Sequence, residues 1–164
     1  KKDPRHFAPL YEKHFNSVFR FVYSRVQNKD LTADLTSQTF TKALMALSRY
    51  EDRGYAFSSW LIRIAINEIN MHFRKNSKHK FAEVSENQLI TLMVEAEEPA
   101  DDMQVVVKAL NEMEEDQVSL IELRFFEKKS FAQIGEILSV AEDTAKMRVY
   151  RALKRLRKLV LEKK

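Results

Sequence analysis

The 164-residue sequence is poor in the residues that usually join strands or cross-link a chain. There is no cysteine, which excludes disulfide bonds and thiolate metal sites. Only two glycines and three prolines occur, so few turn residues are available for a sheet with many hairpins. We therefore expect an all-α fold.

Several functional signatures are also missing. No run approaches eighteen apolar residues, so the sequence predicts no membrane span, and no signal-peptide pattern opens it. A reducing, cytoplasmic setting is the simplest expectation. The sequence has no phosphate loop, no GxSxG motif and no paired acids in a likely cleft. Its four histidines lack metal-ligand spacing: they are His6, His14, His72 and His79. We expect no enzyme activity, no cofactor and no metal.

Charge is distributed unevenly along the chain. The overall net charge is +4, but residues 1–80 carry +8, residues 81–104 carry −7 and residues 105–164 carry +3. Pro99 and its acidic neighbours are typical of a linker. The length suits two small domains. We predict helical domains over 1–80 and 105–164, joined by an acidic linker over 81–104, with a polyanion as a candidate partner for both basic ends.

Apolar residues at spacings of three and four predict the helices. In the first domain these helices cover residues 5–26, 31–48 and 58–75, with Asp30 and Ser58 or Ser59 as N-caps. Leu31, Leu35, Phe40, Leu44 and Leu47 are the apolar positions of the second helix, and Leu61, Ala65, Ile69 and Phe73 those of the third. In the second domain the predicted helices cover 105–113, 116–127, 130–138 and 142–161. The apolar positions of the last helix are Val149, Leu153, Leu156 and Val160. The linker has room for a short helix near Leu89–Val94.

The last two predicted helices form a helix-turn-helix pattern. They are separated by Ser139-Val-Ala141, and a turn of three to four residues is typical of this motif. Seven cations crowd the final helix: Lys146, Arg148, Arg151, Lys154, Arg155, Arg157 and Lys158. Its N-terminal half suits a major groove and its later cations suit phosphates. The alternative interpretation is an ordinary surface helix with a solvated basic face.

A second candidate site lies where a loop enters the third helix. The stretch Tyr50-Glu-Asp-Arg-Gly-Tyr-Ala-Phe-Ser-Ser-Trp60 places four aromatic residues near Arg49, Arg53 and Arg63. Aromatic rings stack on unpaired bases, and nearby cations meet phosphates. Asn67, Asn70 and Arg74 follow at helical spacing and suit base edges. The alternative is that Phe57 and Trp60 are core residues and the asparagines are solvated; for Trp60 taken alone, the core interpretation is favoured.

These motifs together resemble those of an extracytoplasmic-function (ECF) sigma factor, the smallest kind of sigma-70-type initiation factor. The similarity covers nearly all of the chain except residues 81–104. Leu10-Tyr-Glu-Lys-His-Phe15 resembles the start of the family's region 2, and Asp34-Leu-Thr-Ser-Gln-Thr-Phe40 its polymerase-clamp helix. Phe57-Ser-Ser-Trp-Leu-Ile-Arg-Ile-Ala-Ile-Asn67 is similar to the promoter-melting motif, and Ala109 to Leu156 resembles region 4.

The resemblance implies a function, partners and sites. It implies binding to core RNA polymerase, recognition of the minus-10 and minus-35 promoter elements, and opening of the duplex; an anti-sigma factor is a further expected partner. The implied minus-10 residues are Arg53, Tyr55, Phe57, Ser58, Trp60, Arg63, Asn67, Asn70 and Arg74. The implied minus-35 residues are Lys146, Met147, Arg148, Tyr150, Arg151 and Arg155. The implied polymerase contacts are Asp34, Leu35 and Gln38, and the acidic linker would thread through a basic channel of the polymerase.

The sequence departs from the family pattern in places that matter for these sites. Ser37-Gln38 stands where Gln-Glu is usual, which removes a carboxylate from the clamp helix. Ala141 cannot cap the final helix, so Glu142 or Asp143 must supply the anion at its N-terminus. Met147 replaces a frequent serine and suits contact with a thymine methyl group.

Two other functions fit parts of the sequence. A helix-turn-helix regulator, with residues 1–80 as a dimerisation or sensor domain, would bind duplex DNA without polymerase. A helical adaptor that binds only protein would affect no DNA. The basic, aromatic stretch at 49–60 favours the sigma factor, because a dimerisation domain does not need it.

Overall fold

The computed structural model describes residues 7–52, 54, 56–76 and 103–163 of the chain. The chain divides into two compact units, Lys1–Lys78 and His79–Lys164. The described residues form seven α-helices and two short helical segments and contain no strand, which confirms the all-α prediction. The predicted linker lies outside the described residues except for its last two positions, and the helix predicted near Leu89–Val94 lies wholly outside them.

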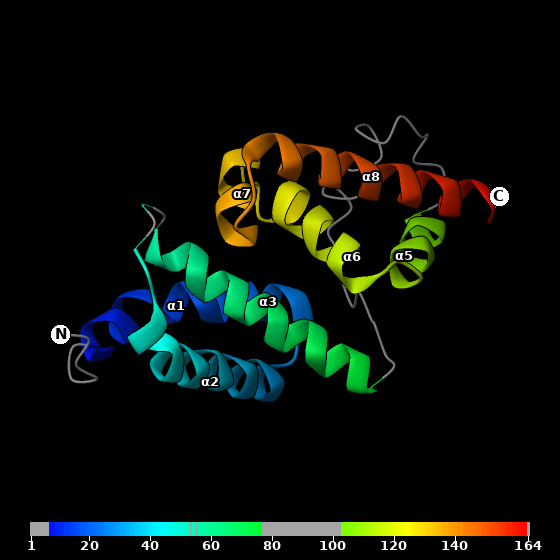
Figure 1. Cartoon of the computed structure of the whole chain (residues 1–164). Helices are drawn as coiled ribbons and strands as arrows, with labels where there is room; N and C mark the ends of the chain where they lie inside the picture. The colour runs from blue at the N-terminus through cyan, green and yellow to red at the C-terminus, as the bar shows by residue number, and fades with distance from the viewer. Residues whose placement is uncertain (1–6, 53, 55, 77–102, 164) are drawn as a thin grey trace. The chain divides into compact units, whose positions relative to one another are not determined.

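The first unit is a three-helix bundle of α1 (Phe7–Val26), α2 (Lys29–Ala46) and α3 (Phe57–Asn76), with the short segment η2 (Leu47–Arg49) after α2. Each of the three helices packs against the other two (Figure 1). The predicted core row of α3 is confirmed, because Leu61, Ala65, Ile69 and Phe73 are all buried. Arg25 of α1 lies over the Phe73 ring, 5.2 Å from its centroid, and so helps to join α1 to α3.

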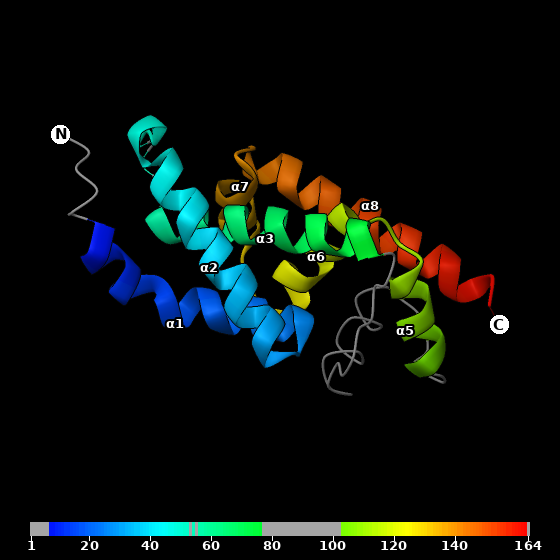
Figure 2. The ribbon, with the colours of Figure 1, turned by 90° about the horizontal axis from the view of Figure 1, so that it is seen from below.

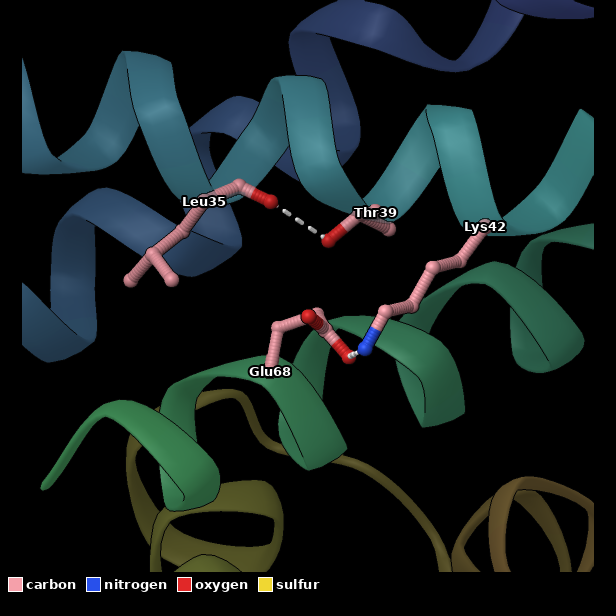
Figure 3. A network of polar contacts seen from close by, with 4 residues as sticks. All are labelled: Leu35, Thr39, Lys42 and Glu68. Atoms are coloured by element: carbon pink, nitrogen blue, oxygen red, sulfur yellow. Dashed lines mark hydrogen bonds and ion pairs between the residues drawn. The ribbon is translucent and has the colours of Figure 1, made fainter. Parts of the chain in front are cut away.

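Threonine, rather than leucine, forms much of the buried face of α2. Thr32, Thr36 and Thr39 are fully buried. The Thr39 hydroxyl donates to the carbonyl of Leu35 at 2.7 Å (Figure 3), and the Thr32 hydroxyl donates in the same way to Asn28 at 2.7 Å. Bonding to the preceding turn satisfies these two hydroxyls without a partner from another helix, whereas the buried Thr36 hydroxyl has no hydrogen-bond partner among the residues that the structure describes.

Two sequence predictions about this unit are wrong. Leu44, expected in the apolar row of α2, is exposed, since the buried face of α2 is centred on Thr32, Thr39 and Ala43 and Leu44 lies to one side of it. The predicted N-caps are also incorrect. Asn28 caps α2, its side chain accepting from the Leu31 N–H at 2.9 Å, and Asp30 lies in the first turn. Ser58 and Ser59 fall inside α3, which begins at Phe57.

The second unit consists of α5 (Met103–Asn111), α6 (Glu115–Ile121), the π-helical segment η3 (Glu122–Phe126), α7 (Phe131–Leu138) and α8 (Glu142–Leu161). Helix α8 packs against α5, α6 and α7. Its predicted apolar row is confirmed by the burial of Val149, Leu153, Leu156 and Val160. Figure 2 shows α5 near the C-terminal end of α8, where Lys163 pairs with Glu112 at 2.6 Å.

The α7–α8 turn has the geometry of a tightly built helix-turn-helix. A capping box at Ser130 and Gln133 starts α7. Ser139 ends it in the left-handed region, with φ 54°. A Cβ on Gly135 would lie 2.7 Å from the Val140 carbonyl oxygen, so only glycine admits this approach. Ala141 makes no side-chain cap, and Glu142 and Asp143 occupy the first turn of α8 as predicted.

Among the helices that the structure describes, none combines the length and the apolar character needed to cross a membrane.

Candidate nucleic-acid interfaces

Four aromatic side chains gather at the start of α3, and we call them the aromatic cluster: His14, Tyr50, Phe57 and Trp60. Phe57 is central, with its ring centroid 5.6 Å from that of His14, 5.4 Å from Tyr50 and 5.2 Å from Trp60. Tyr50 and Trp60 are 4.9 Å apart. All four are half-buried. The cluster is thus supported by the bundle while part of its ring surface faces solvent.

Electrostatics keep the two titratable members of this cluster uncharged. Burial lowers the pKa of His14, and the nearby Lys13 ammonium lowers it further. Burial raises the pKa of Tyr50, and the Asp52 carboxylate adds to this shift. Both effects disfavour the charged form. Near neutral pH the cluster therefore presents neutral π-faces, the kind of surface on which any base can stack.

The predicted minus-10 residues of α3 do not all reach the surface. Arg63, Asn67 and Arg74 are exposed, and Ser58 is half-buried. Asn70 is only 4% exposed. Its neighbours at i−4 and i+3 are the core residues Ile66 and Phe73, so it lies at the edge of the buried face. Asn70 is thus buried in the free bundle, and its assignment to a base edge stays a prediction.

Trp60 is half-buried rather than fully enclosed, so the core interpretation holds only in part. Arg53 and Tyr55 lie outside the described residues. His14 was not among the predicted site residues. It belongs to α1 and meets Phe57 only through the tertiary fold, and no local pattern around it differs from that of an ordinary polar helix position.

The second candidate interface is the outward face of α8. All six predicted minus-35 residues are exposed there: Lys146, Met147, Arg148, Tyr150, Arg151 and Arg155. The Tyr150 ring centroid lies 6.0 Å from that of Phe131 at the start of α7. The buried row on the opposite face anchors α8, so these side chains project from a rigid element.

Arg124 stabilises the part of this interface that Phe131 forms. Its guanidinium lies over the Phe131 ring, 4.5 Å from the centroid, and its Nη1 donates to the Lys129 carbonyl at 3.1 Å. The same side chain thus holds both the loop before α7 and the ring that contacts Tyr150. No sequence pattern marks Arg124, which lies in the π-helical segment η3.

The predicted polymerase contacts on α2 include both exposed and buried residues. Asp34 and Gln38 are exposed, but Leu35 is only 2% exposed. Leu35 shares the buried face with Thr32 and Thr39, at i−3 and i+4. Leu35 packs inside the free domain, as its place in the apolar row predicts, and its assignment as a polymerase contact stays a prediction.

Both structural units are similar to known proteins. The family models "Sigma-70 region 2" and "Sigma-70, region 4" match residues 10–79 and 109–158. The ECF RNA polymerase sigma factor BldN of Streptomyces coelicolor is 29% identical over 94% of this chain, which spans 60% of BldN's length. The RNA polymerase sigma factor YlaC of Bacillus subtilis is 26% identical, with 91% of this chain and 88% of YlaC covered.

A solved structure also matches: the sigma factor RpoE in complex with the anti-sigma factor NepR from Bartonella quintana. It has a TM-score of 0.55 and 25% identity and covers 96% of this chain and 98% of RpoE. The two family models lie in the two structural units, in the order that the sequence motifs predict. The chain therefore belongs to the sigma-70 family as an ECF sigma factor with regions 2 and 4, a non-enzymatic subunit of the kind that directs RNA polymerase in promoter recognition and transcription initiation.

Proposed function

We propose that this chain brings core RNA polymerase to promoters through two separate DNA contacts. The aromatic cluster and the exposed polar side chains of α3 take up unpaired minus-10 bases, and the outward face of α8 reads the duplex minus-35 element. The exposed part of α2 around Asp34 and Gln38 contacts the polymerase. An anti-sigma factor is a further partner, and the site of action is the cytoplasm.

The observation that carries the minus-10 assignment is the half-buried state of the aromatic cluster. Aromatic rings that belonged only to the core would be fully buried in the bundle. Rings that lay only on the surface would lack the contacts that Tyr50 and Trp60 make with Phe57. Exposed Arg63 and Asn67 follow on the same helix, where a cation can meet phosphate and an amide can meet a base edge. Neutral rings beside such groups suit single-stranded nucleic acid.

The first experiment is transcription in vitro with purified core polymerase and a library of promoter fragments. Starts at discrete sites only in the presence of this chain are expected. On the promoters so found, Tyr50→Ala should reduce open-complex formation by roughly 5- to 100-fold, the range for losing one stacked base, while binding to core polymerase is retained. Permanganate reactivity of minus-10 thymines measures opening.

Tyr23→Ala is the matched control, because Tyr23 is exposed on α1 and outside the cluster. Equal opening by the Tyr50→Ala and Tyr23→Ala variants would refute the minus-10 assignment. If core polymerase gains no promoter specificity while the chain alone binds duplex DNA, the regulator alternative is correct instead.

A further inference from the structure

Met147 occupies the outermost position in the N-terminal half of α8. Ala145 and Val149, two residues before and two after it, are both buried. Since an α-helix turns by about 100° per residue, both lie on the opposite side of the helix from Met147. Met147 is 48% exposed. A long apolar side chain in this direction points away from the core of its unit.

The surroundings of Met147 suit DNA rather than the apolar centre of a protein interface. Lys146, Arg148 and Arg151 flank it and are exposed. The Arg151 Nη2 lies 3.6 Å from the Met147 sulfur, so the thioether rests against a cation. Charged residues are depleted from the centre of protein interfaces, while a ring of cations is the electrostatic signature of a phosphate-lined groove.

Tyr150 extends the apolar surface by one turn. It is also 48% exposed, and it lies at i+3 from Met147, which puts both on one side of the helix. Phe131 stands beside the Tyr150 ring, so this ring is buttressed from α7. Together Met147 and Tyr150 form an apolar strip between cations, on the half of α8 that enters a major groove in a helix-turn-helix protein.

We infer that Met147 is a specificity-determining residue that reads the C5-methyl group of a thymine in the minus-35 element, with Tyr150 closing the apolar strip beside it. This inference rests on the proposed minus-35 role of α8. The thymine methyl is the apolar group that base pairs display in the major groove, and apolar side chains contact it there. The cations around Met147 would bind the flanking phosphates and so fix how deeply Met147 enters the major groove.

The test uses holoenzyme, made from the full chain and core polymerase, on the minus-35 element selected from a random duplex library. Each thymine of that element is replaced in turn by deoxyuridine, which removes only the methyl group. At one position the replacement should lower the affinity of the wild-type holoenzyme about threefold to tenfold, as expected for losing one buried methyl contact. With Met147→Ser, deoxyuridine and thymidine should bind equally at that position.

Arg155→Gln is the matched control on the same helix: it should weaken binding to thymidine and deoxyuridine duplexes by the same factor. The inference is overturned if the selected element contains no thymine, if no deoxyuridine replacement lowers affinity, or if Met147→Ser keeps the full wild-type difference. Failure to select any minus-35 element would instead refute the proposed role of α8. Circular dichroism of Met147→Ser should match the wild type, because the side chain is outside the core.

Discussion

The ammonium nitrogen of Lys42 lies 2.6 Å from Oε1 of Glu68, and this ion pair joins α2 to α3 (Figure 3). Glu68 is only 3% exposed, whereas Lys42 is 47% exposed. The second carboxylate oxygen of Glu68 has no hydrogen-bond partner among the residues that the structure describes. The ion pair with Lys42 is therefore the main interaction that offsets the cost of burying the Glu68 carboxylate in the region 2 bundle.

Removal of Lys42 should destabilise region 2. We expect Lys42→Met to lower the free energy of unfolding by about 1–3 kcal/mol, because Glu68 stays buried without its partner. Urea denaturation of the full chain measures the change. The double variant Lys42→Met/Glu68→Leu should recover much of the loss, since an apolar pair avoids the desolvation cost.

Lys158→Met is the control for the loss of an exposed ion pair. The Lys158 Nζ lies 3.7 Å from Oε1 of Glu162, and both side chains are exposed. Such surface pairs contribute about 0–1 kcal/mol to the free energy of unfolding. If Lys42→Met and Lys158→Met lowered the free energy of unfolding by the same small amount, the buried pair would have no special role in stability.

The stability of region 2 should fall as the pH drops below neutrality. The folded-state pKa of His14 is lowered by burial and by Lys13, so the unfolded chain takes up the proton first. Stability is then lost as the pH falls through about 6.5, the ordinary value for an unfolded histidine. Melting at about pH 7.5 and about pH 5.5 measures this loss, and His14→Gln should reduce it. An unchanged pH dependence in His14→Gln would mean that other groups account for it.

A side chain at position 135 should disrupt the helix-turn-helix. In Gly135→Ala the new Cβ meets the Val140 carbonyl oxygen at 2.7 Å, and this oxygen belongs to backbone that can move only by opening the turn. We expect a loss of about 1–3 kcal/mol, typical of overpacking. Ala132→Ser, at an exposed position of the same helix, is the control and should cost less than about 1 kcal/mol. Denaturant unfolding of the two variants measures their free energies of unfolding, and Gly135→Ala should show the larger loss.

Glycine at position 139 should stabilise region 4. Ser139 has φ 54°, a conformation that costs an L-residue about 1–2 kcal/mol and costs glycine little. Ser139→Gly should therefore raise the thermal midpoint, with a gain of about 0.5–1 kcal/mol remaining after the greater freedom of glycine in the unfolded chain. Ser139→Ala keeps a Cβ and should show no gain. A gain with alanine but not with glycine would exclude backbone strain as the cause.

Much of the fold was predictable because regularly spaced apolar residues lie on one face of a long amphipathic helix. The rows from Leu61 to Phe73 and from Val149 to Val160 were identified in this way, and both are buried. The threonine face of α2 was not foreseen, because a hydroxyl that bonds to its own helix behaves as an apolar group. That behaviour has no signature in a pattern of polar and apolar letters.

The candidate sites were predictable only where their members are neighbours in sequence. Phe57 and Trp60 stand in one stretch, and the cations of α8 repeat along one helix. The burial of Asn70 was not foreseen, because spacing does not say how wide the buried face of a helix is. His14 and Arg124 act through contacts with distant or irregular elements, which only the tertiary structure reveals.

The aromatic cluster draws its members from three separate places: His14 from α1, Tyr50 from the segment after η2, and Phe57 and Trp60 from α3. Under the proposed function, promoter preference is then encoded across the whole bundle and not in one motif. A selection for variants that use altered minus-10 elements should recover changes at His14, more than forty positions away from Phe57 in the chain. Transplanting α3 alone into another sigma factor would carry over only part of its preference.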